Sequence, residues 1–217
     1  MKAVITGDII DSSKQPYEER TLIIKTLQDS IRYFEERDTC QYSIFRGDSI
    51  QGLLEQPEKA LWHVVYLKSA LKALKTKNAS RSSFADIRIS IGIGRVNFLH
   101  ENLEMSNGEA FEYSGRKLDQ LKGGAKTIAI KSRDEGYNEE WSVVLGLMDE
   151  VLGKWSVQSA EIVKNILEGH DKPTIGRHLN ISLPAISQRK KYAGWNAIQA
   201  VMNRFEKMTK STFKENV

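Results

Sequence analysis

Cysteine and long apolar runs are scarce in this sequence. The single Cys40 excludes an internal disulfide framework and is typical of proteins from a reducing compartment. No apolar run approaches the length that spans a bilayer, and residues 141–148 (WSVVLGLM) are among the longest. Asp8 stands where a signal peptide would have its apolar core. We therefore expect a cytoplasmic protein that does not enter membranes.

A strong overall charge is also lacking, but the charge is unevenly distributed. The formal net charge is +4, while residues 170–217 contain nine Lys or Arg against three acidic residues, a net charge of +6. With 40% hydrophobic and 28% charged residues in 217, the composition suits a soluble globular protein with one large or two small domains. The basic last quarter predicts a polyanion-binding module, although a solvated basic tail would have the same charge.

Hydrophobic periodicity predicts an α+β fold. We expect strands at residues 1–10, 85–96 and 126–132, a β-hairpin at 41–55, and helices at 17–37, 57–75 and 108–121. The order is β-α-β-β-α-β followed by α-β, which begins as the split βαβ or ferredoxin-like arrangement. Residues 148–155 are interpreted as a helix end and a domain boundary.

Gly-Asp pairs interrupt two of the predicted strands, in AVITGDIIDSS and in FRGDSIQGLL. Each pair is compatible with a tight turn. In the predicted topology, however, the first strand lies beside the hairpin, so Asp8 and Asp48 would meet. Two neighbouring carboxylates repel each other unless a cation neutralises them, and Mg²⁺ prefers such oxygen ligands. This arrangement favours a cation site over two unrelated turns.

Four short stretches carry a resemblance to a known superfamily. GDIIDSS, FRGDSI, RISIGIGRV and GEAFEYSGRKL resemble, in order and spacing, the motifs of the class III nucleotide cyclase and diguanylate cyclase (GGDEF) superfamily. Over nearly its full length the chain resembles the SatD family of bacterial proteins. The resemblance implies a nucleotide-cyclase-type βαββαβ domain at residues 1–150 and a helix-turn-helix domain at residues 151–217.

The resemblance also implies roles for individual residues. Asp8, the carbonyl of Ile9 and Asp48 correspond to the metal ligands of the superfamily, with Mg²⁺ as the implied ion. Arg116 corresponds to a group that stabilises the transition state, and it is the candidate catalytic residue. Glu112 stands where cyclases have Asn.

Further departures from the cyclase pattern lie near the two aspartates. Ile44 replaces the lysine that recognises the purine, and Ser49 replaces the second acid of the Gly-Asp-Glu-Phe motif. Asp11 and Ser12 stand where cyclases have a glycine-phenylalanine pair. These departures argue against cyclisation, while a retained fold and metal site remain compatible with them.

Other residues near the first strand are candidates for nucleotide binding. Asp11, Ser12, Ser13 and Arg116 could contact the cation or a phosphate, although each also has an ordinary explanation as turn chemistry or an exposed helical arginine. Gly92 and Gly94 lack a dinucleotide fingerprint and are interpreted as sites of close backbone approach. The histidines have no metal-ligand spacing, so no zinc is expected.

Residues 174–194 (TIGRHLNISLPAISQRKKYAG) have the pattern of a helix-turn-helix. Asn180 can adopt the left-handed turn conformation, Ser182 is a good N-cap, and Pro184 is tolerated in the first turn of the second helix. The second helix of such motifs enters the major groove of DNA. The predicted DNA-binding residues are Arg177, Ser187, Gln188, Arg189, Lys190 and Lys191. An ordinary helical hairpin in a dimerisation domain is the alternative.

Two classes of function follow from the sequence. The first is a DNA-binding transcriptional regulator whose cyclase-like domain binds a metal-nucleotide complex or mediates dimerisation. The second is a metal-dependent enzyme that acts on a nucleotide by degenerate cyclase-type phosphoryl chemistry. A protein-interaction module with both sites vestigial is a third interpretation. The expected partners are double-stranded DNA, a nucleotide and a second copy of the chain.

Overall fold

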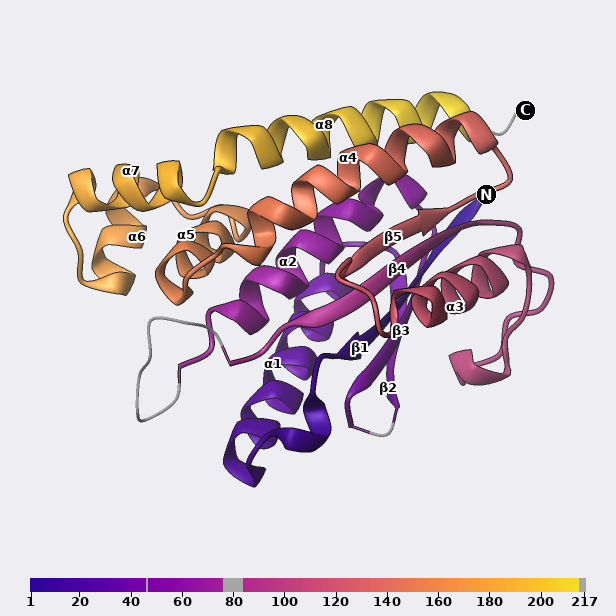
Figure 1. Cartoon of the computed structure of the whole chain (residues 1–217), viewed down its shortest axis with the longest axis horizontal. Helices are drawn as coiled ribbons and strands as arrows, with labels where there is room; N and C mark the ends of the chain where they lie inside the picture. Colours follow the sequence, from indigo (N-terminus) through magenta and orange to yellow (C-terminus); the bar gives the residue numbers. More distant parts are fainter. Residues whose placement is uncertain (46, 76–83, 215–217) are drawn as a thin grey trace.

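The structure of the chain, a computed structural model, describes residues 1–45, 47–75 and 84–214 (Figure 1). Arg46, in the quoted hairpin motif, lies outside the described residues. The strands are β1 (Lys2–Ile9), β2 (Cys40–Phe45), β3 (Ser49–Leu54), β4 (Ile87–Gly94) and β5 (Ile128–Lys131). They form one sheet in the order β2-β3-β1-β4-β5. All neighbouring strands are antiparallel except β4 and β5, which are parallel.

Helices follow the strands in the order that the hydrophobic pattern predicts. Short 3₁₀ turns precede α1 and α2, and a third precedes α3. The α-helices are α1 (Tyr17–Glu35), α2 (Ala60–Lys72), α3 (Glu109–Leu121), α4 (Glu135–Gly153), α5 (Val157–Leu167), α6 (Lys172–Leu179), α7 (Leu183–Tyr192) and α8 (Trp195–Thr212), and the 3₁₀ turns are η1 (Ser12–Lys14), η2 (Pro57–Lys59) and η3 (Leu103–Met105). None of the helices that the structure describes has the length and apolar character needed to cross a membrane.

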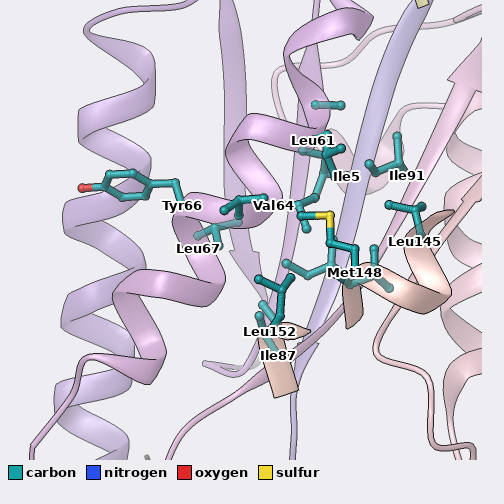
Figure 2. Close-up of a cluster of buried hydrophobic side chains, with 14 of the residues drawn as sticks. Ile5, Leu61, Val64, Tyr66, Leu67, Ile87, Ile91, Leu145, Met148 and Leu152 are labelled. Carbon is teal, nitrogen blue, oxygen red and sulfur yellow. The ribbon is translucent and has the colours of Figure 1, made fainter. Parts of the chain in front are cut away.

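The main core fills one face of the sheet. Ile5 of β1 and Ile87 and Ile91 of β4 point from that face towards side chains of α2 and α4, such as Leu61 and Met148 (Figure 2). Because successive side chains of a strand point to opposite faces, the isoleucines at every second position of β4 all enter this core. The predicted apolar face of this strand is therefore confirmed.

The other face of the sheet is covered by α3, which approaches the backbone closely (Figure 1). A Cβ atom on Gly92 would lie 2.1 Å from the carbonyl oxygen of Ala110, and one on Gly94 would lie 2.9 Å from the backbone nitrogen of Ala110. Ser114 accepts a hydrogen bond of 2.9 Å from the Thr6 hydroxyl at the same contact. The close backbone approach predicted for these glycines is confirmed.

A buried ion network crosses the main core. Lys68 of α2 is fully buried, and its Nζ donates to Asp86 at 2.9 Å and to Thr127 at 2.7 Å. Lys72 pairs with the other oxygen of Asp86, also at 2.9 Å. Although burial by itself raises the pKa of Asp86, the ammonium groups of Lys68 and Lys72 hold it below its usual value. These ion pairs connect α2 to Asp86, the residue that directly precedes β4.

The C-terminal helices share the core of the sheet. Figure 1 shows α8 lying alongside α4, and Phe205 of α8 meets Trp141 of α4 edge-to-face with ring centroids 4.9 Å apart. The Trp155 indole donates to the carbonyl of Ala193 at 2.8 Å. One hydrophobic cluster includes residues on both sides of position 150. The predicted boundary there stays a prediction.

Candidate functional site

The first candidate site lies at the end of β1, around Asp8. Asp8 is the register partner of Ser49 on β3 and of Arg88 on β4. Its Oδ1 accepts a hydrogen bond of 3.1 Å from the Ser49 hydroxyl. Because side chains alternate along a strand, Asp8 shares the sheet face of Val4, which packs against Ala110 of α3. Ser49, Asp8 and Arg88 therefore form one row across three strands.

Asp48 reaches the same end of β1 from the turn between β2 and β3. Its backbone carbonyl accepts a hydrogen bond of 2.9 Å from the Ile9 N–H. Its carboxylate Oδ2 accepts one of 2.7 Å from the Ser12 hydroxyl. Asp8 and Asp48 are thus both next to Ile9, although far apart in the sequence. The fold therefore brings the backbone of Asp48 beside Ile9, and the binding of one cation by both carboxylates stays a prediction.

The oxygen atoms of this region are chemically suited to a hard cation. Within residues 1–45, 47–75 and 84–214, Oδ2 of Asp8 and Oδ1 of Asp48 accept no hydrogen bond. The same residues contain no group of three or more His, Cys, Asp or Glu side chains that could hold a metal. A cation here would depend on two carboxylates, the Ile9 carbonyl and oxygens of a ligand, a set that Mg²⁺ commonly uses with phosphates.

Arg88 belongs to this region, although its motif was interpreted only as a strand. Its Nε is buried and has no hydrogen-bond partner in the described part of the chain. The signal that identifies Arg88 is the alternation in residues 87–94, where the isoleucines take one face and Arg88 takes the face of Asp8. The row therefore places a cationic side chain beside a carboxylate at the end of the sheet.

The remaining candidates from the first loop are more exposed. Asp11 adopts the left-handed conformation with φ 54° and pairs with Lys14 at 2.9 Å. The hydrogen bond from Lys14 lowers the pKa of Asp11, and the more distant charge of Arg88 contributes to the same shift. Ser13 is exposed. Of these three loop residues, Ser12 donates a hydrogen bond to Asp48, one of the three predicted metal ligands.

Arg116 and Glu112 lie one turn apart on α3 and form an ion pair. The side chain of Arg116 is 73% exposed. Within the described residues its guanidinium makes no hydrogen bond or ion pair with Asp8 or Asp48. The assignment of Arg116 as a catalytic residue therefore stays a prediction.

The second candidate site is formed by α6 and α7. Asn180 between them is left-handed with φ 50°, and Ser182 caps α7 by accepting a hydrogen bond from the N–H of Ala185. Ile175 and Ile186 pack with Ile162 of α5 in a small core of their own. The sequence predicted the turn conformation and the cap correctly, because both depend on local chemistry.

The predicted DNA-binding side chains differ in exposure. Ser187, Gln188, Lys191 and Arg177 are exposed, and Lys190 is half-buried. Arg189, in contrast, is 26% exposed and its guanidinium lies 3.9 Å from the carboxylate of Glu161 on α5. DNA binding by Arg189 stays a prediction, and Glu161 of α5 is a neighbouring carboxylate that the local sequence does not reveal.

Comparisons with known proteins give structural likeness only. No protein-family model matches the chain, and no curated protein matches it. The chain is similar to the solved structure of a bacterial light-regulated adenylyl cyclase, at 17% identity and a TM-score of 0.44, over 59% of this chain and 74% of that one.

Two further solved structures are similar to a comparable extent. One is the non-canonical dimeric guanylyl cyclase domain of the RhoGC fusion protein from the aquatic fungus Blastocladiella emersonii, at 19% identity, a TM-score of 0.42 and coverage of 54% and 72%. The other is the catalytic core of a rhodopsin-guanylyl cyclase with converted specificity in complex with ATPalphaS, at 15% identity, a TM-score of 0.40 and coverage of 54% and 71%. These likenesses concern chain arrangement and carry no statement about activity.

Proposed function

We propose that the chain is a DNA-binding regulator whose sheet binds a metal-nucleotide complex at the end of β1. The observation that carries the DNA-binding part is the pair α6 and α7, with its own small core around Ile186 and its left-handed Asn180. Regulators with two such helices insert the second into the major groove. In this proposal residues 151–217 form the helix-turn-helix domain that the SatD resemblance implies, and residues 170–217 carry its positive charge.

The side chains of α7 would then take different roles. Gln188 can make two parallel hydrogen bonds to a base edge, and Lys190 and Lys191 would act mainly through phosphates. Ser187 lies on the same exposed side. Arg189 would have to leave Glu161 before it could reach a base, so we rank Gln188 as the principal base-reading residue.

A binding titration on duplex DNA at several salt concentrations tests the DNA-binding role. Lys191→Ala should weaken binding to all sequences about alike and reduce the slope of log K against log salt by about 1. Gln188→Ala should cost about 1–3 kcal/mol on a selected site and little on random DNA. Lys122→Ala, which removes an exposed lysine next to the end of α3, is the matched control. It should change neither the affinity for DNA nor the salt dependence of binding. Absence of salt-dependent binding by the wild type would refute the DNA-binding role.

The site at the end of β1 supports the second part of the proposal. Asp8, Asp48 and the Ile9 carbonyl would hold Mg²⁺, and hydroxyl groups of Ser12 and Ser13 would face the phosphates. The bound metal would supply charge neutralisation for a polyphosphate. Arg88 of β4 would also stabilise the negative charge of the polyphosphate.

Thermal unfolding measures this binding. Mg²⁺ with a nucleoside triphosphate should raise the melting temperature of the wild type, because the ligand binds the folded state preferentially. Asp48→Asn should abolish most of that rise, while Asp119→Asn, a surface control on α3, should keep it. An equal rise in both variants would place the nucleotide elsewhere and refute the site.

A metal-dependent enzyme on a nucleotide is the second candidate function, and the nearness of Asp8 and Asp48 to Ile9 favours it. The exposed Arg116 would serve such a reaction only if a second copy or a rearrangement brought it to the phosphates. Homodimerisation therefore belongs to this proposal, and sedimentation of the chain with and without Mg²⁺ and nucleotide measures it. Product formation from the triphosphate distinguishes the enzyme from the binding domain.

A further inference from the structure

A cavity of about 510 Å³ lies between α1, α2, α5 and α8, away from both sites described above. Its volume falls within the range of pockets that hold small molecules, about 300–1,000 Å³. Aromatic side chains from three helices line it, namely Tyr33 of α1, Trp62 of α2 and Trp195 of α8. Pockets between packed helices are frequent sites of ligand binding.

The aromatic wall is a cluster of three rings that lie within 6.2 Å of one another. The Tyr33 ring lies parallel to that of Tyr66, with centroids 4.9 Å apart and 9° between the planes. The guanidinium of Arg37 lies 3.7 Å from the Tyr33 ring centroid. Trp62 is nearly parallel to Tyr33 at 6.2 Å and is only half-buried. Tyr33 is also half-buried, but Arg37 already covers one of its faces, so Trp62 is the ring that we assign to a further planar group in the cavity.

The charged side chains of the cavity already have partners. Asp38 is bonded to the buried His63 at 3.0 Å and to Lys59. The hydrogen bond with His63, supported by that with Lys59, lowers the pKa of Asp38 to about 2. Glu58 and Glu206 both lie near Lys210, at 3.9 and 2.5 Å. The wall therefore offers no uncompensated charge to an ionic ligand.

Two amide side chains of α8 are left without such partners. Gln199 and Asn203 are exposed, line the cavity and accept or donate no hydrogen bond among the residues that the structure describes. They lie one helical turn apart, on the same side of α8. Amide groups match the alternating donors and acceptors on the edge of a heterocycle.

We propose that this cavity binds a neutral planar heterocycle, of nucleobase or nucleoside size, stacked on Trp62 and bonded at its edge by Gln199 and Asn203. The site is separate from the proposed metal-nucleotide site and needs neither Asp8 nor Asp48. Trp195, the first residue of α8, connects the cavity to the end of α7.

Fluorine NMR of the full chain with fluorinated tryptophan provides a local test. The chain has four tryptophans, of which Trp62 and Trp195 line the cavity while Trp141 and Trp155 lie elsewhere in the core. Each signal is assigned from its Trp→Phe variant. The probes are adenosine, guanosine, uridine and nicotinamide, titrated to millimolar concentration without metal. At least one should shift the Trp62 and Trp195 signals in a saturable way and leave the other two unchanged.

Variants separate this site from its alternatives. Gln199→Ala with Asn203→Ala, both exposed positions, should weaken the shift about tenfold, and Gln120→Ala, an exposed amide on α3, should not change it. Asp48→Asn should keep the shift, so failure of the metal-nucleotide proposal does not affect the result. Absence of a saturable shift with all four probes would overturn the proposal. A shift with tetramethylammonium alone would also overturn it, because the cavity would then be a cation cage.

Discussion

Replacing Asp86 with Asn should destabilise the protein strongly, because it removes the one carboxylate shared by two buried lysines. Lys68 has 1% of its side chain exposed and Lys72 has 8%. At 2.9 Å and an effective dielectric constant of about 20, each ammonium–carboxylate contact amounts to about 6 kcal/mol of Coulomb energy. Most of this is offset by the cost of removing the charges from water.

Loss of one partner of a buried pair typically costs about 3–5 kcal/mol, since a charge remains buried without compensation. Asn keeps an oxygen that can accept a hydrogen bond, so we expect a decrease of about 3 kcal/mol in the free energy of unfolding for Asp86→Asn. Asp119→Asn is the matched control, because Asp119 pairs with Lys122 at 3.0 Å on the surface. The control should change the free energy by less than about 1 kcal/mol.

Urea unfolding followed by circular dichroism measures both variants. The pKa of Asp86 is lowered in the folded state, so its contribution is complete above the unfolded value near 3.9 and is lost as the pH falls through the folded value. The difference between wild type and Asp86→Asn should therefore shrink at strongly acid pH. A loss no larger than that of Asp119→Asn at neutral pH would refute the reasoning.

Two further predictions concern packing and pH. Gly92→Ala should destabilise the protein by more than about 2 kcal/mol, because its Cβ would lie 2.1 Å from the carbonyl oxygen of Ala110. Gly115→Ala on α3 is the control, because its new Cβ would meet nothing within 4 Å, and it should be neutral or stabilise by up to about 1 kcal/mol. Urea unfolding measures both variants, and an equal change in their free energies of unfolding would contradict the close contact at Gly92. The hydrogen bond with His63 lowers the pKa of Asp38 to about 2. The ionised Asp38 carboxylate therefore stabilises the folded protein fully above about pH 4. Asp38→Asn should therefore flatten the loss of stability between about pH 4 and 2, and an unchanged acid transition would contradict this.

Local chemistry explains what the sequence predicted well. The left-handed Asn180 and the Ser182 cap depend on a few neighbouring residues, and both have the predicted geometry. The position of β1 beside the β2–β3 hairpin joins residues that are distant in the sequence, and it was predicted from the order of the strands and helices. The backbone of Asp48 does lie beside Ile9, as this topology predicts, while a cation shared by the Asp8 and Asp48 carboxylates stays a prediction.

Long-range packing explains what the sequence did not predict. Lys68 lies in a helix that the sequence predicts, but its burial was not predicted, because α2 is buried on almost every side by α1, α5 and the sheet. Arg189 is held by Glu161 of a different helix. The cavity next to Trp62 is formed by four helices that are distant in the sequence. No window of residues contains these contacts, so they emerge only when the whole fold is assembled.

The pairing of α4 with α8 has a consequence for synthesis on the ribosome. Trp141 and Tyr137 are covered by Phe205, and the buried hydroxyls of Tyr137 and Thr209 are bonded at 2.7 Å. Translation proceeds at about 5–20 residues per second, so α8 would be synthesised roughly 4–14 s after these aromatic residues. During that interval the nascent sheet has an uncovered apolar helix. The growing chain is therefore expected to be a client of chaperones that shield such surfaces until the last helix docks.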